Sequence, residues 1–440
     1  MASLGLDAVV MVLVAALVLG TALAAAGGPL DPAEVAARIQ KHRTAEVTLT
    51  VRDGAGKPLA GAAVTVRQVR HRFLFGSNAF SINPDDASPD QAAYQERYAD
   101  LLNYATLPFY WGAFEREEGR PGTERVRKMA AWCKAHGIRA KGHPLCWHEV
   151  PCKWLDGKPL DEVRALQLGR ITREVGGFAG LIDTWDVVNE ACAMPGYGGG
   201  KNPIGNLAKE LGNVEVIKQT FAAARQANPK AYLLLNDYDT SEKYEALIKD
   251  CLAAGVPIDC IGIQSHMHGG YWGAEKAWEV CERFARFGKP LHFTELTILS
   301  AEKHPKMDWH TNLPDWPTTP EGEKRQADQV AEFYTTLFSH PAVEGITWWD
   351  FSDKGAWQGA PSGLVRKDMS PKPAYEALLR LVRKEWWTGP LDLKTDAQGR
   401  VRFRGFLGAY EVEGPAGKGR LEVGSAGEAS ATVTLLDERE

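Results

Sequence analysis

Eight short runs of apolar, β-branched or aromatic residues occur in order along the middle of the chain. They lie at 73–80, 104–110, 139–147, 184–190, 231–238, 260–266, 291–296 and 345–351. Segments with helical periodicity separate most of them, at 92–102, 124–135, 160–171, 215–227, 242–254, 274–287 and 324–338. Strands alternating with helices in this rhythm predict an α/β fold, the (β/α)8 TIM barrel. A doubly wound open sheet is the alternative, and it is disfavoured because no glycine-rich phosphate turn follows the first run.

The two ends of the chain have a different pattern, with short alternating stretches and glycine-rich turns. These stretches lie at 46–51 and 62–69 before the barrel, and at 391–393, 401–406, 410–412 and 431–435 after it. Alternation of this kind predicts strands. We therefore expect an N-terminal β extension at 27–70, a catalytic barrel at 71–385 and a C-terminal β-rich extension at 386–440. We also expect the two extensions to pair into one small β-module.

The first 26 residues have the pattern of an export signal. An apolar block at 8–19 precedes a stretch of mostly small residues at 20–28, with cleavage expected between Ala22 and Ala26. Residues 1–7 contain Asp7 and no Lys or Arg, so a retained membrane anchor stays an alternative. The pattern predicts a secreted, periplasmic or cell-surface protein, with a membrane tether if the segment is not cleaved.

Charge and cysteine content exclude several classes of protein. The formal net charge is -5 and no basic run stands out, which argues against nucleic acid as a partner. The seven cysteines include no CxxC pair, which argues against a zinc ribbon or a dense disulfide framework. Cys146 and Cys152 are close enough in sequence to form one bridge, and buried free thiols are expected for most of the others.

Polar residues that are costly to bury follow six successive predicted strands. They are His143 with Trp147 and His148; Asn189 with Glu190; Asn236, Asp237, Tyr238 and Asp239; Gln264, Ser265 and His266; Glu295; and Asp350 with Asp353. Long irregular segments at 194–206, 301–323 and 354–362 follow strand ends as well. In a TIM barrel the strand-to-helix loops build the active face. This concentration predicts an active site for a bulky substrate.

Glu190 and Glu295 follow the fourth and seventh predicted strands, which can face each other across the barrel mouth. Retaining glycoside hydrolysis needs two carboxyl groups about 5–5.5 Å apart, one protonated and one ionised. Asn189 is suited to hold a sugar 2-hydroxyl beside them. A single glutamate at a strand end is often a structural ion-pair partner, but two of them with this polar surrounding predict catalysis.

The chain resembles glycoside hydrolase family 10, the xylanase-type family, over residues 70–385. The motifs that carry the resemblance are Lys141-Gly142-His143-Pro144-Leu145-Cys146-Trp147-His148, Trp185-Asp186-Val187-Val188-Asn189-Glu190, Asn236-Asp237-Tyr238, Gly262-Ile263-Gln264-Ser265-His266, Thr294-Glu295-Leu296, Thr347 to Trp349 with Trp357, and Pro371-Lys372-Pro373-Ala374-Tyr375. They fall in order along the chain, and their combination is specific.

The resemblance implies a retaining hydrolase of β-1,4 bonds in xylan or a related plant polysaccharide, with no cofactor and no metal. It implies Glu190 as acid/base, Glu295 as nucleophile and His266 as the hydrogen-bond partner of the nucleophile. The expected substrate-binding residues are Asn189, His143, Trp147, Gln264, Tyr238, Trp349, Trp357 and Tyr110. We expect the protein to act as a monomer.

The sequence departs from the family pattern at two places. Where the family usually shows Glu-Asn-x-x-Lys-Trp, this chain has Thr106-Leu107-Pro108-Phe109-Tyr110-Trp111. The charged clamp for the distal sugar is thus replaced by apolar and aromatic groups, and we expect sugar binding there to differ. Thr297 replaces a common Asp two residues after the nucleophile, which we expect to alter the surroundings of His266.

Two other classes of function remain open from the residues alone. A metal-dependent hydrolase could use His143, His148, His266 and His268 with Asp237 or Asp350. A non-catalytic carbohydrate-binding barrel would keep the tryptophans. Single loop tryptophans, Trp272, Trp309 and Trp316, are suited to stacking on sugars but more often pack, and Trp132, Trp386 and Trp387 are expected in the core or at an interface.

Overall fold

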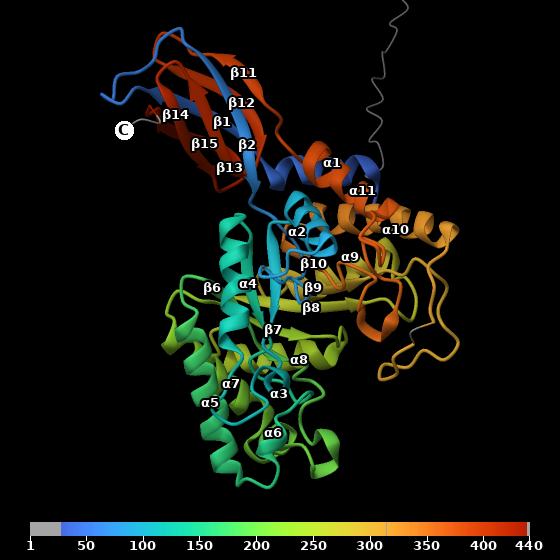
Figure 1. Ribbon diagram of the computed structural model, residues 1–440. Helices are drawn as coiled ribbons and strands as arrows, with labels where there is room; N and C mark the ends of the chain where they lie inside the picture. Colours follow the sequence, from blue (N-terminus) through green and yellow to red (C-terminus); the bar gives the residue numbers. More distant parts are fainter. Residues whose placement is uncertain (1–27, 314, 438–440) are drawn as a thin grey trace, which may run out of the picture.

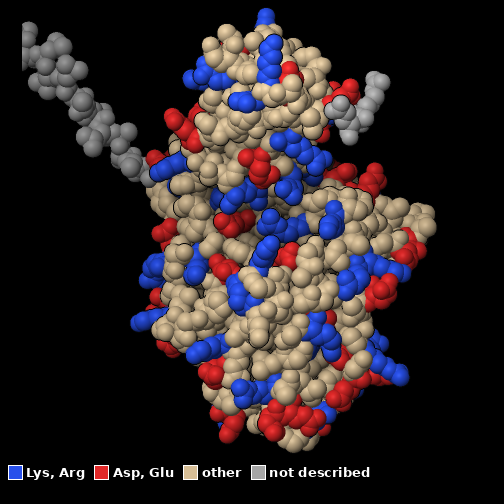
Figure 2. All heavy atoms as spheres, turned by 90° about the vertical axis from the view of Figure 1, so that its left-hand side faces the viewer, with Lys and Arg blue, Asp and Glu red and all other residues tan. Residues whose placement is uncertain are grey.

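The computed structural model describes residues 28–313 and 315–437 of the chain, so the predicted export signal lies outside the described residues. Figure 1 shows a barrel with helices around it and a smaller module of strands at one end. Figure 2 shows the same two parts from the side, with a waist between them.

Eight parallel strands close into a barrel in the order β10-β3-β4-β5-β6-β7-β8-β9. Their bounds are β3 Leu74–Asn78, β4 Tyr104–Pro108, β5 Arg139–His143, β6 Ile182–Asn189, β7 Tyr232–Asp237, β8 Cys260–His266, β9 Leu291–Thr297 and β10 Val343–Trp348. Because the sheet closes on itself, the predicted (β/α)8 barrel is confirmed and the open sheet is wrong.

Helices cover the outside of the barrel. They are α2 Pro89–Leu101, α3 Trp111–Phe114, α4 Thr123–Ala135, α5 Leu160–Gly177, α6 Pro203–Leu211, α7 Asn213–Ala227, α8 Glu242–Ala253, α9 Gly273–Ala285, α10 Pro320–Ser339 and α11 Pro373–Arg380. The helix α7 buries Val216, Ile217, Phe221 and Ala224, which is the spacing of one helical face. Amphipathic helices of this kind cover the strands, whose residues are almost entirely buried.

The strand ends that carry the site depend on close packing inside the barrel. A Cβ atom on Gly142 would lie 2.1 Å from the ring of Trp185, so only glycine fits between β5 and β6 at this point. Two predicted runs extended too far, because β4 ends at Pro108 and β5 ends at His143, just before Pro144. Proline lacks the N–H that continues a strand ladder.

The chain segments on either side of the barrel form one β-module of two sheets, with the strand orders β12-β1-β15 and β11-β2-β13-β14. The strands are β1 Thr44–Arg52, β2 Ala63–His71, β11 Leu391–Lys394, β12 Arg400–Phe406, β13 Gly408–Gly414, β14 Gly417–Val423 and β15 Gly427–Thr434. The expected pairing of the two ends is confirmed, since β1 pairs with β12 and β15, and β2 pairs with β11 and β13. The module has its own apolar core, separate from that of the barrel.

The helix α1 (Pro32–Arg43) precedes the module, and no prediction covered it. Only Ile39 and Arg43 of this helix are buried, so its apolar pattern is weak. All seven cysteines are buried free thiols, and the bridge considered between Cys146 and Cys152 is absent. Among the helices of residues 28–313 and 315–437, none is long and apolar enough to cross a membrane.

Candidate active site

Glu190 directly follows β6 and has a positive φ of 56°. Three side chains donate hydrogen bonds to its carboxyl group. Trp147 Nε1 donates to Oε2 over 2.9 Å, while Gln264 Nε2 and Asn189 Nδ2 donate to Oε1 over 3.0 and 3.2 Å. The predicted site residues Trp147, Asn189 and Gln264 therefore all meet at Glu190.

The surroundings of Glu190 favour its protonated form. Burial raises the pKa of this carboxyl to about 8, and the negative charge of Glu295 acts in the same direction. The hydrogen bonds from Gln264 and Trp147 oppose the shift without cancelling it. A carboxyl group with this pKa carries a proton at neutral pH and can donate it.

Glu295 lies within β9 at the mouth of the barrel and is 4% exposed. Asn236 Nδ2 donates a hydrogen bond to Oε1 over 2.9 Å, and Nε2 of His266 lies 3.1 Å from Oε2. Nε2 of His143 lies 3.9 Å from Oε1. This carboxyl group is therefore surrounded by nitrogen atoms that can stabilise a negative charge.

Glu295 is shifted in the opposite direction to Glu190. Burial alone would raise the pKa of Glu295, but His143 and the hydrogen bond from His266 outweigh it, and the net pKa lies below its usual value. One glutamate is thus held as an acid and the other as a carboxylate. Pairs of titratable groups with opposed pKa shifts are a signature of acid/base catalysis.

Asn236, at the end of β7, joins the two glutamates. Besides its bond to Glu295, its Nδ2 donates to Asn189 Oδ1 over 2.6 Å. Its own Oδ1 accepts from the Thr294 hydroxyl over 2.5 Å. Asn236 was noted in the sequence only as part of a motif at a strand end, and the geometry makes it the link between Glu190 and Glu295.

A buried ion pair of Lys141 and Asp186 lies against His143. Nζ of Lys141 lies 2.6 Å from Oδ2 of Asp186, and both side chains are fully buried. The same oxygen lies 2.8 Å from Nδ1 of His143. Burial alone would raise the pKa of Asp186, but Lys141 and His143 hold it below the usual value. The carboxylate fixes the orientation of His143 toward Glu295, a role that sequence reasoning did not assign to Lys141 or Asp186.

Asp350, just after β10, is a third buried carboxyl group at the mouth. It has a positive φ of 72°, which is rare for a residue with a side chain. Its Oδ2 accepts hydrogen bonds from the backbone N–H of Trp357 over 2.9 Å and from the Ser362 hydroxyl over 3.3 Å. Burial raises the pKa of Asp350 to about 6 despite these bonds. The carboxyl group anchors the loop that carries Trp357.

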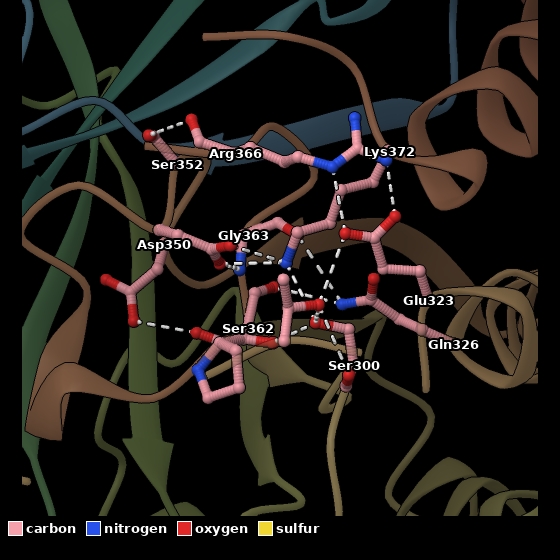
Figure 3. A network of polar contacts seen from close by, with 12 residues as sticks. Ser300, Glu323, Gln326, Asp350, Ser352, Ser362, Gly363, Arg366 and Lys372 are labelled. Atoms are coloured by element: carbon pink, nitrogen blue, oxygen red, sulfur yellow. Dashed lines mark hydrogen bonds and ion pairs between the residues drawn. The ribbon is translucent and has the colours of Figure 1, made fainter. Parts of the chain in front are cut away.

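The loops beyond Asp350 are held by a second network, shown in Figure 3. Nζ of Lys372 lies 2.8 Å from Asp353 Oδ2 and donates to the Ser300 hydroxyl over 2.9 Å. Arg366 Nε donates to Glu323 over 2.9 Å. These contacts tie the loop after β9 to the loop after β10, so Asp353 supports the loops rather than lining the site.

Aromatic rings form a wall beside the glutamates. Tyr110 contacts the rings of His143 and Trp147, with centroids 5.4 and 5.5 Å apart. Trp349 contacts His143 edge-on at 5.4 Å, and Phe80 contacts both Trp349 and Tyr110. The structure therefore brings the predicted Tyr110, Trp147 and Trp349 together, and adds Phe80, which the sequence did not single out.

Trp357 and Tyr238 are the exposed aromatic residues of the predicted set. Trp357 is 37% exposed and packs against the His266 ring at 4.8 Å. Trp309 stacks on Trp357 with centroids 5.9 Å apart, whereas Trp316 is buried. Tyr238, directly after β7, is 52% exposed. Exposed rings of this kind are suited to stack on sugar faces.

The two departures from the family motifs differ in their consequences. Thr106 and Leu107 lie in β4 with fully buried side chains. Only Tyr110 of this run lies at the site. The hydroxyl of Thr297 lies 3.3 Å from Nδ1 of His268, while Nδ1 of His266 is buried without a hydrogen-bond partner.

The histidines considered as metal ligands do not converge. Among the described residues, the one group of three side chains whose ligand atoms lie within 4.8 Å of one another is His148, Glu149 and Glu190. Neither His143 nor His266 belongs to it. Asp237 accepts hydrogen bonds from the backbone N–H groups of Cys192 and Asp239 instead, each over 2.9 Å. The donor set does not match the metal site considered from the sequence.

A parallel barrel with two carboxyl groups of opposed pKa at its strand ends has the architecture of a glycoside hydrolase. The model of glycosyl hydrolase family 10 matches residues 79–381 of this chain. The chain belongs to glycosyl hydrolase family 10.

Individual relatives are similar at low identity. The anti-sigma-I factor RsgI6 of Acetivibrio thermocellus is 26% identical over 85% of this chain and 45% of its own length. The endo-1,4-beta-xylanase/feruloyl esterase of Xylanibacter ruminicola is 28% identical over 64% of this chain and 41% of its own length. The chain therefore spans less than half of these curated relatives.

Among solved structures, xylanase 10B from Thermotoga petrophila in complex with xylobiose is 25% identical. The match covers 71% of this chain and 95% of that one, with a TM-score of 0.60. The part of the chain that this match covers corresponds in size to the barrel.

Proposed function

We propose that this protein is a retaining, endo-1,4-β-xylanase-like glycoside hydrolase that cleaves xylan or a related plant polysaccharide. The observation that carries the proposal is the opposed pKa of Glu190 and Glu295, which share one hydrogen-bond chain through Asn189 and Asn236. Family membership and the xylanase relatives support the substrate class.

In this mechanism Glu190 donates its proton to the leaving glycosidic oxygen while Glu295 attacks the anomeric carbon. The glycosidic C–O bond breaks and a bond from Glu295 to the sugar forms. Glu190, now ionised, takes a proton from water, and the water oxygen displaces Glu295. His266 and His143 stabilise the ionised Glu295 before attack and after release.

Substrate contacts are assigned by position around the two glutamates. We assign Asn189 and Gln264 to hydrogen-bond the sugar, because both side chains lie beside Glu190. The remaining assigned contacts are His143, Trp147, Trp349, Trp357, Tyr110 and Tyr238. Glycans with a β-1,4 backbone present flat apolar faces that suit such rings.

The cellular setting is part of the same proposal. The apolar N-terminal segment and the substrate class favour a secreted, periplasmic or cell-surface protein. Retention of that segment would tether the enzyme to a membrane. Fractionation of cells that express the full chain, with N-terminal sequencing of the product, tests both outcomes.

The direct test is a substrate screen of the purified protein on xylan, arabinoxylan, mixed-linkage glucan and aryl β-xylobiosides. We expect xylo-oligosaccharide products, unaffected by a chelator. Glu295→Gln is the matched control, because it keeps the size of the side chain and removes the nucleophile. No release of sugar from any substrate by the unaltered protein would overturn the proposal.

A non-catalytic carbohydrate-binding barrel is the second candidate, because the aromatic rings at the barrel mouth suit sugar binding even without turnover. Such a protein would bind oligosaccharides without turnover. Calorimetric titration with xylohexaose, followed by product analysis of the same sample, separates the two functions.

A further inference from the structure

A second cleft lies between the β-module and the barrel, far along the strands from the two glutamates. It consists of two cavities of about 530 and 390 Å³ that share Arg70, His71 and Glu422 in their lining. The floor is formed near the amino ends of β3, β4, β5 and β10, at Leu74, Asn103, Arg139 and Glu344. Glu190 and Glu295 lie at the opposite, carboxyl ends of the strands. We call this space the basal cleft.

The basal cleft is rich in arginine although the whole chain has a net charge of -5. Its lining includes Arg43, Arg70, Arg72, Arg139, Arg383 and Arg420. The acidic residues of the lining are Glu344 and Glu422. Figure 2 shows Lys and Arg atoms gathered around the waist between the module and the barrel. The cleft is therefore a concentration of positive charge on a mildly acidic protein.

Two of these arginines have structural partners. Arg43 donates to the backbone carbonyls of Phe338, His340 and Val343, and Arg383 donates to those of Asp100 and Ala99. These two guanidinium groups hold α1 and the chain after α11 against the barrel, so they do not count as available for a ligand.

The other arginines are exposed and largely free of acidic partners. Arg70 forms one loose ion pair with Glu422, at 3.6 Å. Arg72, Arg139 and Arg420 take part in none of the ion pairs formed within residues 28–313 and 315–437. A guanidinium group matches a carboxylate with two parallel hydrogen bonds. Unpaired guanidinium groups around one cleft are suited to bind such an anion.

The wall of the cleft also offers groups that suit a sugar. Trp387 and Phe75 line the larger cavity, and the guanidinium of Arg383 lies 5.1 Å from the Trp387 ring. Nε2 of His71 lies 2.5 Å from the carbonyl of Trp386, while its Nδ1 is buried without a partner. Burial lowers the pKa of His71 to about 4, so the ring is neutral and Nδ1 is an unpaired acceptor in the wall of the cleft.

We propose that the basal cleft binds an acidic saccharide, a uronic-acid unit carried by the polysaccharide substrate. Its carboxylate lies on Arg72 and Arg139 in the smaller cavity, and a neighbouring sugar lies against Trp387 in the larger one. The assignment of a saccharide rests on the proposed function. The two cavities fall in the usual size range of small-ligand sites. Binding there holds a charged glycan on the enzyme at a point remote from the catalytic glutamates.

The test is calorimetric titration of the full chain with two xylo-oligosaccharides of equal length, one bearing a glucuronic acid branch and one neutral. We expect the doubly substituted variant Arg72→Ala/Arg139→Ala to bind the acidic oligosaccharide at least tenfold more weakly and the neutral one unchanged. Arg402→Ala is the matched control, because it removes an exposed arginine of the same module that lines neither cavity. Circular dichroism of the variants verifies that the module stays folded.

Several results would overturn the proposal. They are equal binding of the acidic and neutral ligands, unchanged binding by the double variant, and displacement of the acidic ligand by equimolar inorganic phosphate, which would indicate a general anion site. All titrations are made in the Glu295→Gln background, so binding is measured without turnover. An inactive unaltered protein would refute the proposed hydrolysis and leave this test intact. Hydrolysis of an aryl xylobioside by the double variant at the unaltered rate is expected, because the cleft lies away from the glutamates.

Discussion

Nε2 of His266 lies 3.1 Å from Oε2 of Glu295, while the other ring nitrogen of His266 is buried without a partner. A histidine that supports a carboxylate usually has its second nitrogen fixed by another group. Here Thr297 bonds to His268 instead. The orientation of His266 therefore depends on Glu295 itself and on ring packing against Trp357 and Trp349.

Replacement of His266 tests whether its hydrogen bond keeps Glu295 ionised. In His266→Ala the carboxylate of Glu295 loses a hydrogen-bond donor, so its pKa should rise. We expect the acid limb of the kcat/KM profile to move up by about one pH unit. His310→Ala, on the exposed loop before α10, is the control. An unchanged acid limb in His266→Ala would mean that this histidine does not set the ionisation of Glu295.

The alkaline limb of the same profile reports Glu190. Its pKa of about 8 predicts that activity falls as the pH rises through that value, because the proton for the leaving group is lost. A substrate with a nitrophenyl leaving group needs this proton less and should show a weaker limb. On xylan, whose leaving group needs the proton, Glu190→Gln should be at least about a hundredfold slower. The alkaline limb should be absent from the pH profile of this variant. A limb that persists in this variant would assign the proton to another group.

Stability measurements test the buried Asp350. Its carboxyl ionises near 3.8 in an unfolded chain and at about 6 in the folded protein. Between these values the folded state binds more protons, so the free energy of unfolding falls as the pH rises. Asp350→Asn has no such group to ionise. We therefore expect the free energy of unfolding of the variant, relative to that of the unaltered protein, to rise by up to about 3 kcal/mol from pH 4 to pH 7. Denaturant unfolding at both pH values measures the free energy of unfolding of the two proteins. If their difference were the same at pH 4 and pH 7, the raised pKa of Asp350 would be contradicted.

Substitution of Tyr110 tests whether the aromatic wall beside the glutamates binds the substrate. Tyr110→Ala removes the ring that contacts His143 and Trp147, and we expect kcat/KM on xylohexaose to fall about tenfold. Tyr110→Phe keeps the ring and should retain most of the activity. If the alanine variant binds and turns over as the unaltered protein does, the aromatic wall has no part in substrate binding.

The sequence predicted the barrel well because each strand is an apolar run of its own, buried on both faces, and each helix has one apolar face. It predicted Glu190 and Glu295 as a pair at the barrel mouth, because polar groups at the ends of buried strands are costly unless they have a function. The predicted strands ended too late at Tyr110 and Trp147, because both residues follow a proline, Pro108 and Pro144, beyond the end of the observed strand.

Relationships across long stretches of chain could not be predicted. Asn236 meets Glu295 and Asn189 only because β6, β7 and β9 converge at the barrel mouth. Asp350 accepts a hydrogen bond from the backbone N–H of Trp357. The conformation of the loop that carries Trp357 could not be predicted from the local sequence. The basal cleft depends on how the β-module lies against the barrel, which neither part encodes alone.

In the proposed function Glu190 and Glu295 hydrolyse the glycosidic bond in two displacements. The most direct measurement is proton NMR of the anomeric signals in the first minutes of xylohexaose hydrolysis. Double displacement predicts that the β anomer of the new reducing end forms first and that the α anomer follows only by mutarotation. Initial release of the α anomer would show a single displacement and would contradict the assignment of Glu295 as the nucleophile.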